Sequence, residues 1–229
     1  TMAPSYVINN KTVYLWDMRV TIPDSIVICD KKITLPYLKT IPSETPYSFS
    51  AENCKIVFGK KTLFDTLYLK YSTKDDFHQI HDIFTPVREE MIMTLRFDSI
   101  KTIQNKTAVY HFSSPKNYKF IGGNWEANDI VFKSKFLGGF GLIEDLKSPT
   151  VKPVKINNKE LQFNISDFPS GIKQFKCYLD STFVPMHYDF KRKLLWAEKK
   201  DKTIPFKGSL KLVVIDQMNN ETILEKNIK

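Results

Sequence analysis

Few residues in this sequence are suited to catalysis or to binding a transition metal. Two of its 4 histidines, His78 and His81, have H-x-x-H spacing, which on a helix places both rings on one face and so could hold a metal. No H-E-x-x-H, G-x-S-x-G, Walker or dinucleotide-binding motif is present. The alternative for the histidines is a solvated polar loop. We expect no catalytic residue, no metal ligand and no cofactor in this chain.

Aspartates in the C-terminal part suggest a second kind of site. They lie at or near predicted loops, and loops of a β-sandwich can gather carboxylates around calcium. Turn formation is the commoner role of aspartate at such positions, and we favour it because these residues are far apart in sequence and mixed with lysines. The set consists of Asp167, Asp180, Asp189, Asp201 and Asp216.

A basic segment with an internal tryptophan is the predicted ligand-binding site. Residues 147–229 carry 16 Lys or Arg against 9 Asp or Glu, which accounts for most of the net charge of +9. Basic and aromatic side chains together could hold a polyanion or stack on sugars. The alternative is a core tryptophan beside a solvated hairpin. The candidate residues are Lys191, Arg192, Lys193, Trp196, Lys199, Lys200 and Lys202.

The elements that would carry these residues are predicted to be strands. Apolar and polar residues alternate over residues 13–18, 25–29, 47–50, 55–58, 66–72, 91–97, 109–113, 119–125, 129–134 and 138–143. A single helical turn is conceivable only over 75–83, and the glycines at 138–141 indicate a bend beside a strand. The pattern predicts an all-β protein.

Two prolines between residues 145 and 153 mark the predicted domain boundary. We expect a β-sandwich domain over 1–146 and an immunoglobulin-like β-sandwich domain over 147–229, with six strands within 161–165, 172–179, 183–188, 193–196, 209–215 and 222–225. Neither part shows an internal repeat.

Three cysteines are present, namely Cys29, Cys54 and Cys177. Cys29 and Cys54 are close enough in sequence to form a disulfide, and the alternative that we favour is buried free thiols. No apolar run approaches the roughly 20 residues of a membrane span, and no signal peptide is visible. Because a Thr precedes the first Met, we expect the chain to be a piece of a longer protein.

Several segments, in their order along the chain, resemble the region that follows the catalytic domain in large lysostaphin-type zinc murein endopeptidases of Gram-negative bacteria. In the first part they are Val13–Arg19, Ile22–Ile26, Leu63–Leu69, Phe120–Glu126 and Gly139–Ile143. In the second part they are Phe163–Ile172 and Leu212–Asn220. The zinc site of that family needs H-x-x-x-D followed by H-x-H, and it is not complete here because no H-x-H occurs.

This resemblance implies a non-catalytic accessory region that positions the enzyme or binds cell wall, glycan or protein. The implied partners are a cell-wall glycan or an envelope protein and the peptidase domain of the parent chain, in the periplasm or at the cell surface as a secreted protein. Neither a membrane span nor nucleic-acid binding is expected. The alternative function is a stand-alone module that binds polyanions or glycans through the basic C-terminal domain.

Overall fold

The computed structural model describes residues 5–14, 23, 25–28, 30–35, 37–97, 103–199, 201 and 203–229. Strands dominate this part of the chain, and its only helical element is the 3-10 turn η1 (Gln104–Lys106). Within it, no helix is long and apolar enough to cross a membrane. The prediction of an all-β protein is therefore confirmed.

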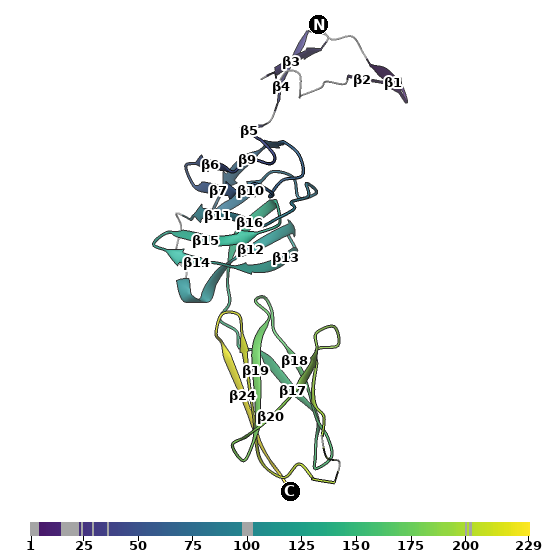
Figure 1. Ribbon diagram of the computed structural model, residues 1–229, viewed down its shortest axis with the longest axis vertical. Coiled ribbons are helices and arrows are strands. Elements are labelled where there is room, and N and C mark those ends of the chain that lie inside the picture. Colours follow the sequence, from purple (N-terminus) through teal and green to yellow (C-terminus); the bar gives the residue numbers. More distant parts are fainter. Residues whose placement is uncertain are drawn as a thin grey trace.

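Two antiparallel sheets of five strands each form the first sandwich (Figure 1). One sheet has the spatial order β13 (Asn117–Gly122), β12 (Thr107–Ser114), β16 (Gly138–Glu144), β10 (Phe77–Ile80) and β9 (Tyr71–Lys74). The other has the order β14 (Asn124–Glu126), β15 (Asp129–Ser134), β11 (Met91–Arg96), β7 (Cys54–Phe58) and β6 (Tyr47–Ala51). A short pair, β5 (Lys39–Ile41) and β8 (Leu67–Leu69), adds to this body.

Alternation along the strands explains the first core. In β7, Cys54, Ile56 and Phe58 are buried whereas the residues between them are exposed, as expected for a strand with one face on a core. In β11, Met91 and Met93 follow the same rule. These side chains belong to one cluster that also receives residues from β12, β15 and β16.

The second sandwich has the strand arrangement of an immunoglobulin-like domain. One sheet has the order β17 (Thr150–Ile156), β18 (Leu161–Ser166), β22 (Leu194–Ala197) and β21 (His187–Asp189). The other has the order β20 (Thr182–Val184), β19 (Ile172–Leu179), β23 (Gly208–Asp216) and β24 (Glu221–Ile228). Taken in chain order, the first, second, sixth and fifth strands share a sheet, which is the ABED pattern of immunoglobulin folds once β20 is counted as an extra strand at the edge of the other sheet.

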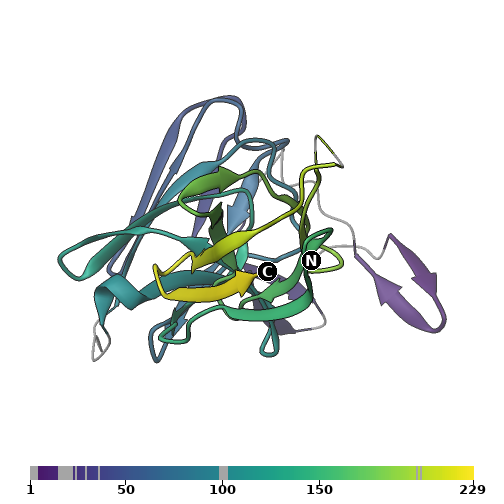
Figure 2. The same cartoon turned by 90° about the horizontal axis from the view of Figure 1, so that it is seen from below.

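Two small hairpins precede the first sandwich. They are β1 (Tyr6–Ile8) with β2 (Lys11–Val13), and β3 (Ser25–Ile28) with β4 (Lys31–Thr34). Figures 1 and 2 both show β1–β2 projecting away from the two sandwiches. The predicted strand over 13–18 begins at the last residue of β2, and its residues 15–18 lie outside the described residues.

Two sequence-based expectations about local structure are wrong. The conceivable helical turn at 75–83 is instead the hairpin β9–β10, in which Asp75 and Asp76 adopt φ values of 51° and 60°. Aspartate tolerates this left-handed region, which two-residue hairpin turns require. The proline-rich segment after Ser148 also contains a strand, β17, in which Pro153 lies at a sheet edge beside a register shift.

The two cysteines that the structure describes agree with the alternative of buried free thiols. Cys54 and Cys177 are free and buried, and burial raises the pKa of their thiols to about 12 and about 11, so both are protonated at neutral pH. Cys29 lies outside the described residues.

The predicted boundary at 146/147 falls in the connection between β16 and β17.

Candidate functional site

The predicted basic site is only partly assembled by the fold. Lys191, Arg192 and Lys193 occupy the exposed turn between β21 and β22, where the Arg192 backbone N–H donates to Asp189 Oδ1 at 3.0 Å. Lys199 lies beyond β22, where its Nζ donates to the Asn158 carbonyl at 2.7 Å. Lys200 and Lys202 lie outside the described residues.

Trp196 is not a core tryptophan, contrary to the alternative interpretation of the sequence. Its neighbours Leu195 and Ala197 belong to the second core, so Trp196 lies on the opposite, outer face of its sheet. There it stacks on His187 from the adjacent strand, with ring centroids 5.5 Å apart and an interplanar angle of 25°. This aromatic pair and the basic turn are formed by the same hairpin.

All five loop aspartates make the hydrogen bonds that the turn interpretation predicts, although carboxylate oxygens of Asp167 and Asp216 also lie within 4.8 Å of each other. Four of them accept a backbone N–H from their own loop, as aspartate does in turns, and Asp180 accepts one from β23, the spatial neighbour of β19. The donors are Gly171 for Asp167, Ser209 for Asp180, Arg192 for Asp189, Thr203 for Asp201, and Met218 and Asn220 for Asp216.

His78 and His81 do not form the helical pair that their spacing suggested, because His78 lies on the strand β10 and His81 follows that strand with a φ of 55°. His78 is buried on β10, where its Nδ1 shares a hydrogen bond with the Tyr71 hydroxyl at 3.0 Å. His81 follows the strand, and its Nδ1 accepts the Lys70 backbone N–H at 3.4 Å. Burial lowers the pKa of His81.

His111 has a structural role inside the first sandwich. Its Nε2 hydrogen-bonds the Leu137 carbonyl at 2.9 Å, and its ring stacks on Phe136 with centroids 5.0 Å apart. Burial lowers the pKa of His111, which favours the neutral ring. An ionised imidazole is therefore disfavoured at this position.

The sequence did not indicate an apolar pocket on the outer face of the sheet β13-β12-β16-β10-β9. The cavity has a volume of about 560 Å³. We call it the glycine pocket, after Gly139. It is lined by Phe77, Gln79, Ile83, Phe112, Ser113, Ser114, Pro115 and Gly139. None of these side chains ionises in the physiological pH range, so the pocket offers apolar contact, hydroxyls and one amide.

The glycines create this pocket by letting an aromatic ring lie across the sheet. A Cβ atom on Gly139 would overlap the ring of Phe77, and one on Gly141 would lie 3.2 Å from the same ring. Phe77 in turn contacts Phe112 edge to face, with centroids 5.4 Å apart. The glycine run that the sequence suggested to be a bend thus leaves the space in which the Phe77 ring packs against the sheet.

Aromatic contacts continue from the pocket towards the second sandwich. Phe112 contacts Tyr118 at 5.3 Å between centroids, and Tyr118 contacts Tyr110 at 5.8 Å and Phe168 at 5.5 Å. Phe168 belongs to the second sandwich, as does Met218, which packs on Tyr110. The outer face of this sheet is therefore covered at one end by the second sandwich and open at the glycine pocket.

Polar contacts hold the two sandwiches together at the covered end. Lys106 Nζ donates to the Met218 carbonyl at 2.9 Å and to Asn220 Oδ1 at 2.7 Å. Asn220 Nδ2 donates to the Asp145 carbonyl at 2.9 Å. In Figure 1, the turn between β23 and β24, which contains Met218 and Asn220, faces the first sandwich. We call this set of contacts the junction.

Together, these features define a two-domain all-β protein in which one sheet face carries the junction at one end and an aromatic pocket at the other. Residues 39–145 match the family model of the Zu5-like domain. The matched region begins with β5 and ends at Asp145, just after β16, so it corresponds to the first sandwich. No curated protein sequence matches this chain significantly.

Replacing Gly139 by Ala tests the packing of the pocket. The new methyl group would displace the Phe77 ring, and such overpacking is expected to lower the free energy of unfolding by about 1–3 kcal/mol. Urea denaturation would measure this change. The control is Gly59→Ala, whose added Cβ would meet Thr62 Oγ1 at an ordinary 3.4 Å. Equal stability of the Gly139→Ala variant and the unmodified protein would contradict this account of the pocket.

Proposed function

We propose that this chain is a non-catalytic accessory region of a cell-envelope zinc peptidase, acting in the periplasm or at the cell surface. Its role would be to bind cell wall, glycan or an envelope protein while holding the attached enzyme at a fixed distance. The order of the resembling segments along the chain supports the link to lysostaphin-type peptidases. The glycine pocket supports the binding role.

The observation that carries this proposal is the open end of the aromatic sheet face. Ligand sites are commonly concave and apolar, with a few polar groups that fix orientation. The glycine pocket has this character, with Phe77 and Phe112 supplying ring surface and Gln79 and Ser113 supplying hydrogen-bonding groups. Because the pocket lies on the same sheet as the junction, a ligand bound there would have a fixed position relative to both sandwiches.

Co-sedimentation of the purified chain with peptidoglycan sacculi tests this proposal. We expect binding without release of soluble fragments, in the presence of zinc as well as in its absence. Phe77→Ala should weaken binding at least about tenfold, which corresponds to roughly 1.4 kcal/mol of lost contact. The matched control is Phe190→Ala, which removes a 79% exposed ring from the second sandwich.

Zinc-dependent cleavage of the sacculi by this chain would disprove the non-catalytic role. Equal binding by the Phe77→Ala variant and the unmodified chain would disprove the role of the glycine pocket. Melting temperatures of both Phe variants show whether a loss of binding reflects unfolding.

The hairpin β21–β22 favours a second candidate function, the binding of an anionic glycan or another polyanion. Trp196 and His187 form a stacked pair on the outer sheet face, and the exposed turn of the same hairpin carries Lys191, Arg192 and Lys193. Aromatic rings with nearby cations can stack on sugars and attract negative charge. This arrangement supports the alternative without requiring a parent peptidase.

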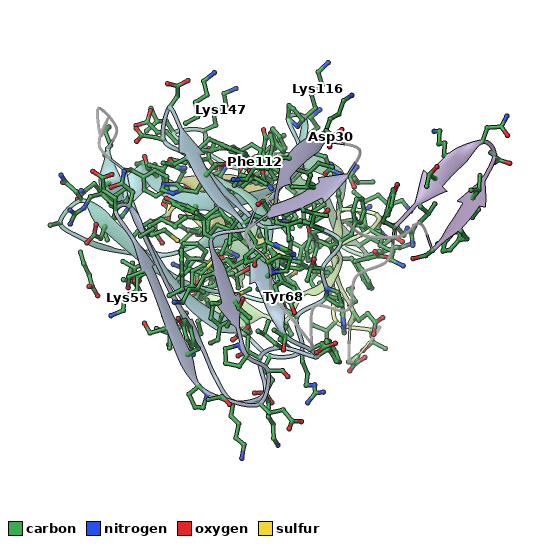
Figure 3. All side chains as sticks on the ribbon, turned by 90° about the horizontal axis from the view of Figure 1, so that it is seen from above. Asp30, Lys55, Tyr68, Phe112, Lys116 and Lys147 are labelled. Carbon is green, nitrogen blue, oxygen red and sulfur yellow. The ribbon has the colours of Figure 1, made fainter. Side chains whose placement is uncertain are left out.

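Retention on a heparin column tests this second function. Replacing Lys191, Arg192 and Lys193 by Glu should lower the salt concentration needed for elution, because the attraction is electrostatic and screened by salt. Replacing Lys60, Lys61 and Lys116 by Glu gives a control of equal charge change on the first sandwich. All three control lysines are exposed, and Lys116 extends outwards at the periphery in Figure 3. An equal loss of retention in both triple variants would contradict a specific basic site.

A further inference from the structure

Three aspartates from separate segments gather at the junction. Asp145 follows β16, Asp167 follows β18, and Asp216 ends β23. One carboxylate oxygen from each lies within 4.8 Å of those of the other two. Asp145 and Asp216 are buried, with exposed fractions of 1% and 0%, whereas Asp167 is half-buried.

The negative charge of this cluster is not neutralised by a basic side chain in the described part of the structure. Lys106 is close by, but its ammonium group donates to the uncharged acceptors Met218 O and Asn220 Oδ1. No ion pair within 4.0 Å joins a described Lys, Arg or His to any of the three aspartates. Buried charges in proteins are normally paired or bound to a metal ion, so a positive partner is expected here.

Hydrogen bonds fix the carboxylates but leave lone pairs available. Each ionised carboxylate has about four acceptor positions. Among the described residues, each of the three carboxylates receives fewer than four hydrogen bonds, and Asp167 Oδ1 receives none. The donors are the Lys147 and Ser170 N–H groups to Asp145, Ser170 Oγ and the Gly171 N–H to Asp167, and the Met218 N–H, the Asn220 N–H and Asn220 Nδ2 to Asp216.

Tyr110 provides an independent indication of a ligand at this place. Its side chain is 0% exposed, and its hydroxyl oxygen has no hydrogen-bond partner among the described residues. Tyr110 packs against Met218, whose backbone N–H donates to Asp216 Oδ1 at 2.8 Å, so its ring lies beside the cluster. A buried hydroxyl without a partner is costly, and a water molecule on a bound cation would satisfy it.

We propose that Asp145, Asp167 and Asp216 bind a divalent cation of the calcium type at the junction. Calcium takes six to eight oxygen ligands at about 2.3–2.6 Å, so oxygens on opposite sides of the ion are about 5 Å apart. The spacing of the three carboxylates fits this limit. Oxygen-only donors favour calcium or magnesium over zinc, which prefers nitrogen and sulfur ligands. The flexible coordination of calcium suits the irregular loops better than the strict octahedron of magnesium.

The cation would join the two sandwiches. Asp145 lies in the connection between them, Asp167 and Asp216 lie in loops of the second sandwich, and Tyr110 lies on the first. An ion bound to these groups would stabilise the contacts of Lys106 and Asn220 across the junction. This inference does not depend on the proposed accessory function, because it concerns only the junction itself.

Isothermal titration of the full chain with calcium chloride tests the site. We expect one calcium ion per chain. At 100 times the dissociation constant, calcium should raise the melting temperature by about 5–10 °C relative to a chelator-treated sample. Absence of both binding heat and a melting shift at millimolar calcium would overturn the proposal. Equal responses to calcium and magnesium would overturn the assignment to calcium.

Conservative variants locate the ion. Asp167→Asn keeps the size of the side chain and an oxygen for its turn hydrogen bonds, and it should weaken calcium binding at least about tenfold because it removes one charged ligand. The matched control is Asp201→Asn, which removes the same charge from another loop of the second sandwich and should leave the affinity unchanged. Equal weakening in both variants would show general charge attraction and overturn the site.

Terbium luminescence gives a readout that does not depend on stability. Terbium replaces calcium at oxygen sites, and its emission rises when a nearby tyrosine absorbs the exciting light. Tyr110→Phe should therefore reduce the tyrosine-excited emission of the bound ion by about half or more. Unchanged emission in this variant, with the second sandwich still folded by circular dichroism, would contradict a site beside Tyr110.

Discussion

The apolar outer face of the sheet β13-β12-β16-β10-β9 is the constraint on which the arrangement of the two sandwiches depends. An antiparallel sheet often leaves one face in water. Here both faces carry large apolar side chains, because Val109 and Phe140 point into the first core while Tyr110 and Phe112 point outwards. The outward aromatic residues must be covered, and Met218 of the second sandwich covers part of them. The junction is therefore a consequence of the composition of this one sheet.

Polar groups give the junction its specific geometry. Apolar contact between Met218 and Tyr110 tolerates sliding, whereas hydrogen bonds from Lys106 and Asn220 require one orientation. Asp145 makes hydrogen bonds to both sandwiches. Its backbone N–H donates to the Lys106 carbonyl at 2.8 Å, and its side chain accepts the Ser170 N–H at 3.2 Å. A single residue in the connection thus contacts both sandwiches.

The sequence predicted the elements better than their contacts. Alternation in β7 and β11 is a local property, so the strands and the fold class could be found without a structure. Two of the contacts depend on which strands are neighbours in space: Gly139 with Phe77, and Asp145 with Asp216. A local sequence pattern carries no information about strand order. The basic cluster around Lys191 was visible because it is contiguous. The sequence left the burial of Trp196 open, and the alternation of β22 resolves it.

We infer that the junction holds the two sandwiches in one orientation. Residual dipolar couplings of backbone N–H groups, measured on the full chain in a weakly aligned medium, test it most directly. Couplings from β7, β11 and β12 and those from β18, β19 and β23 should fit a single alignment tensor with the arrangement in Figure 1. Two different tensors, or one of much smaller magnitude for the second sandwich, would show independent motion and contradict the account.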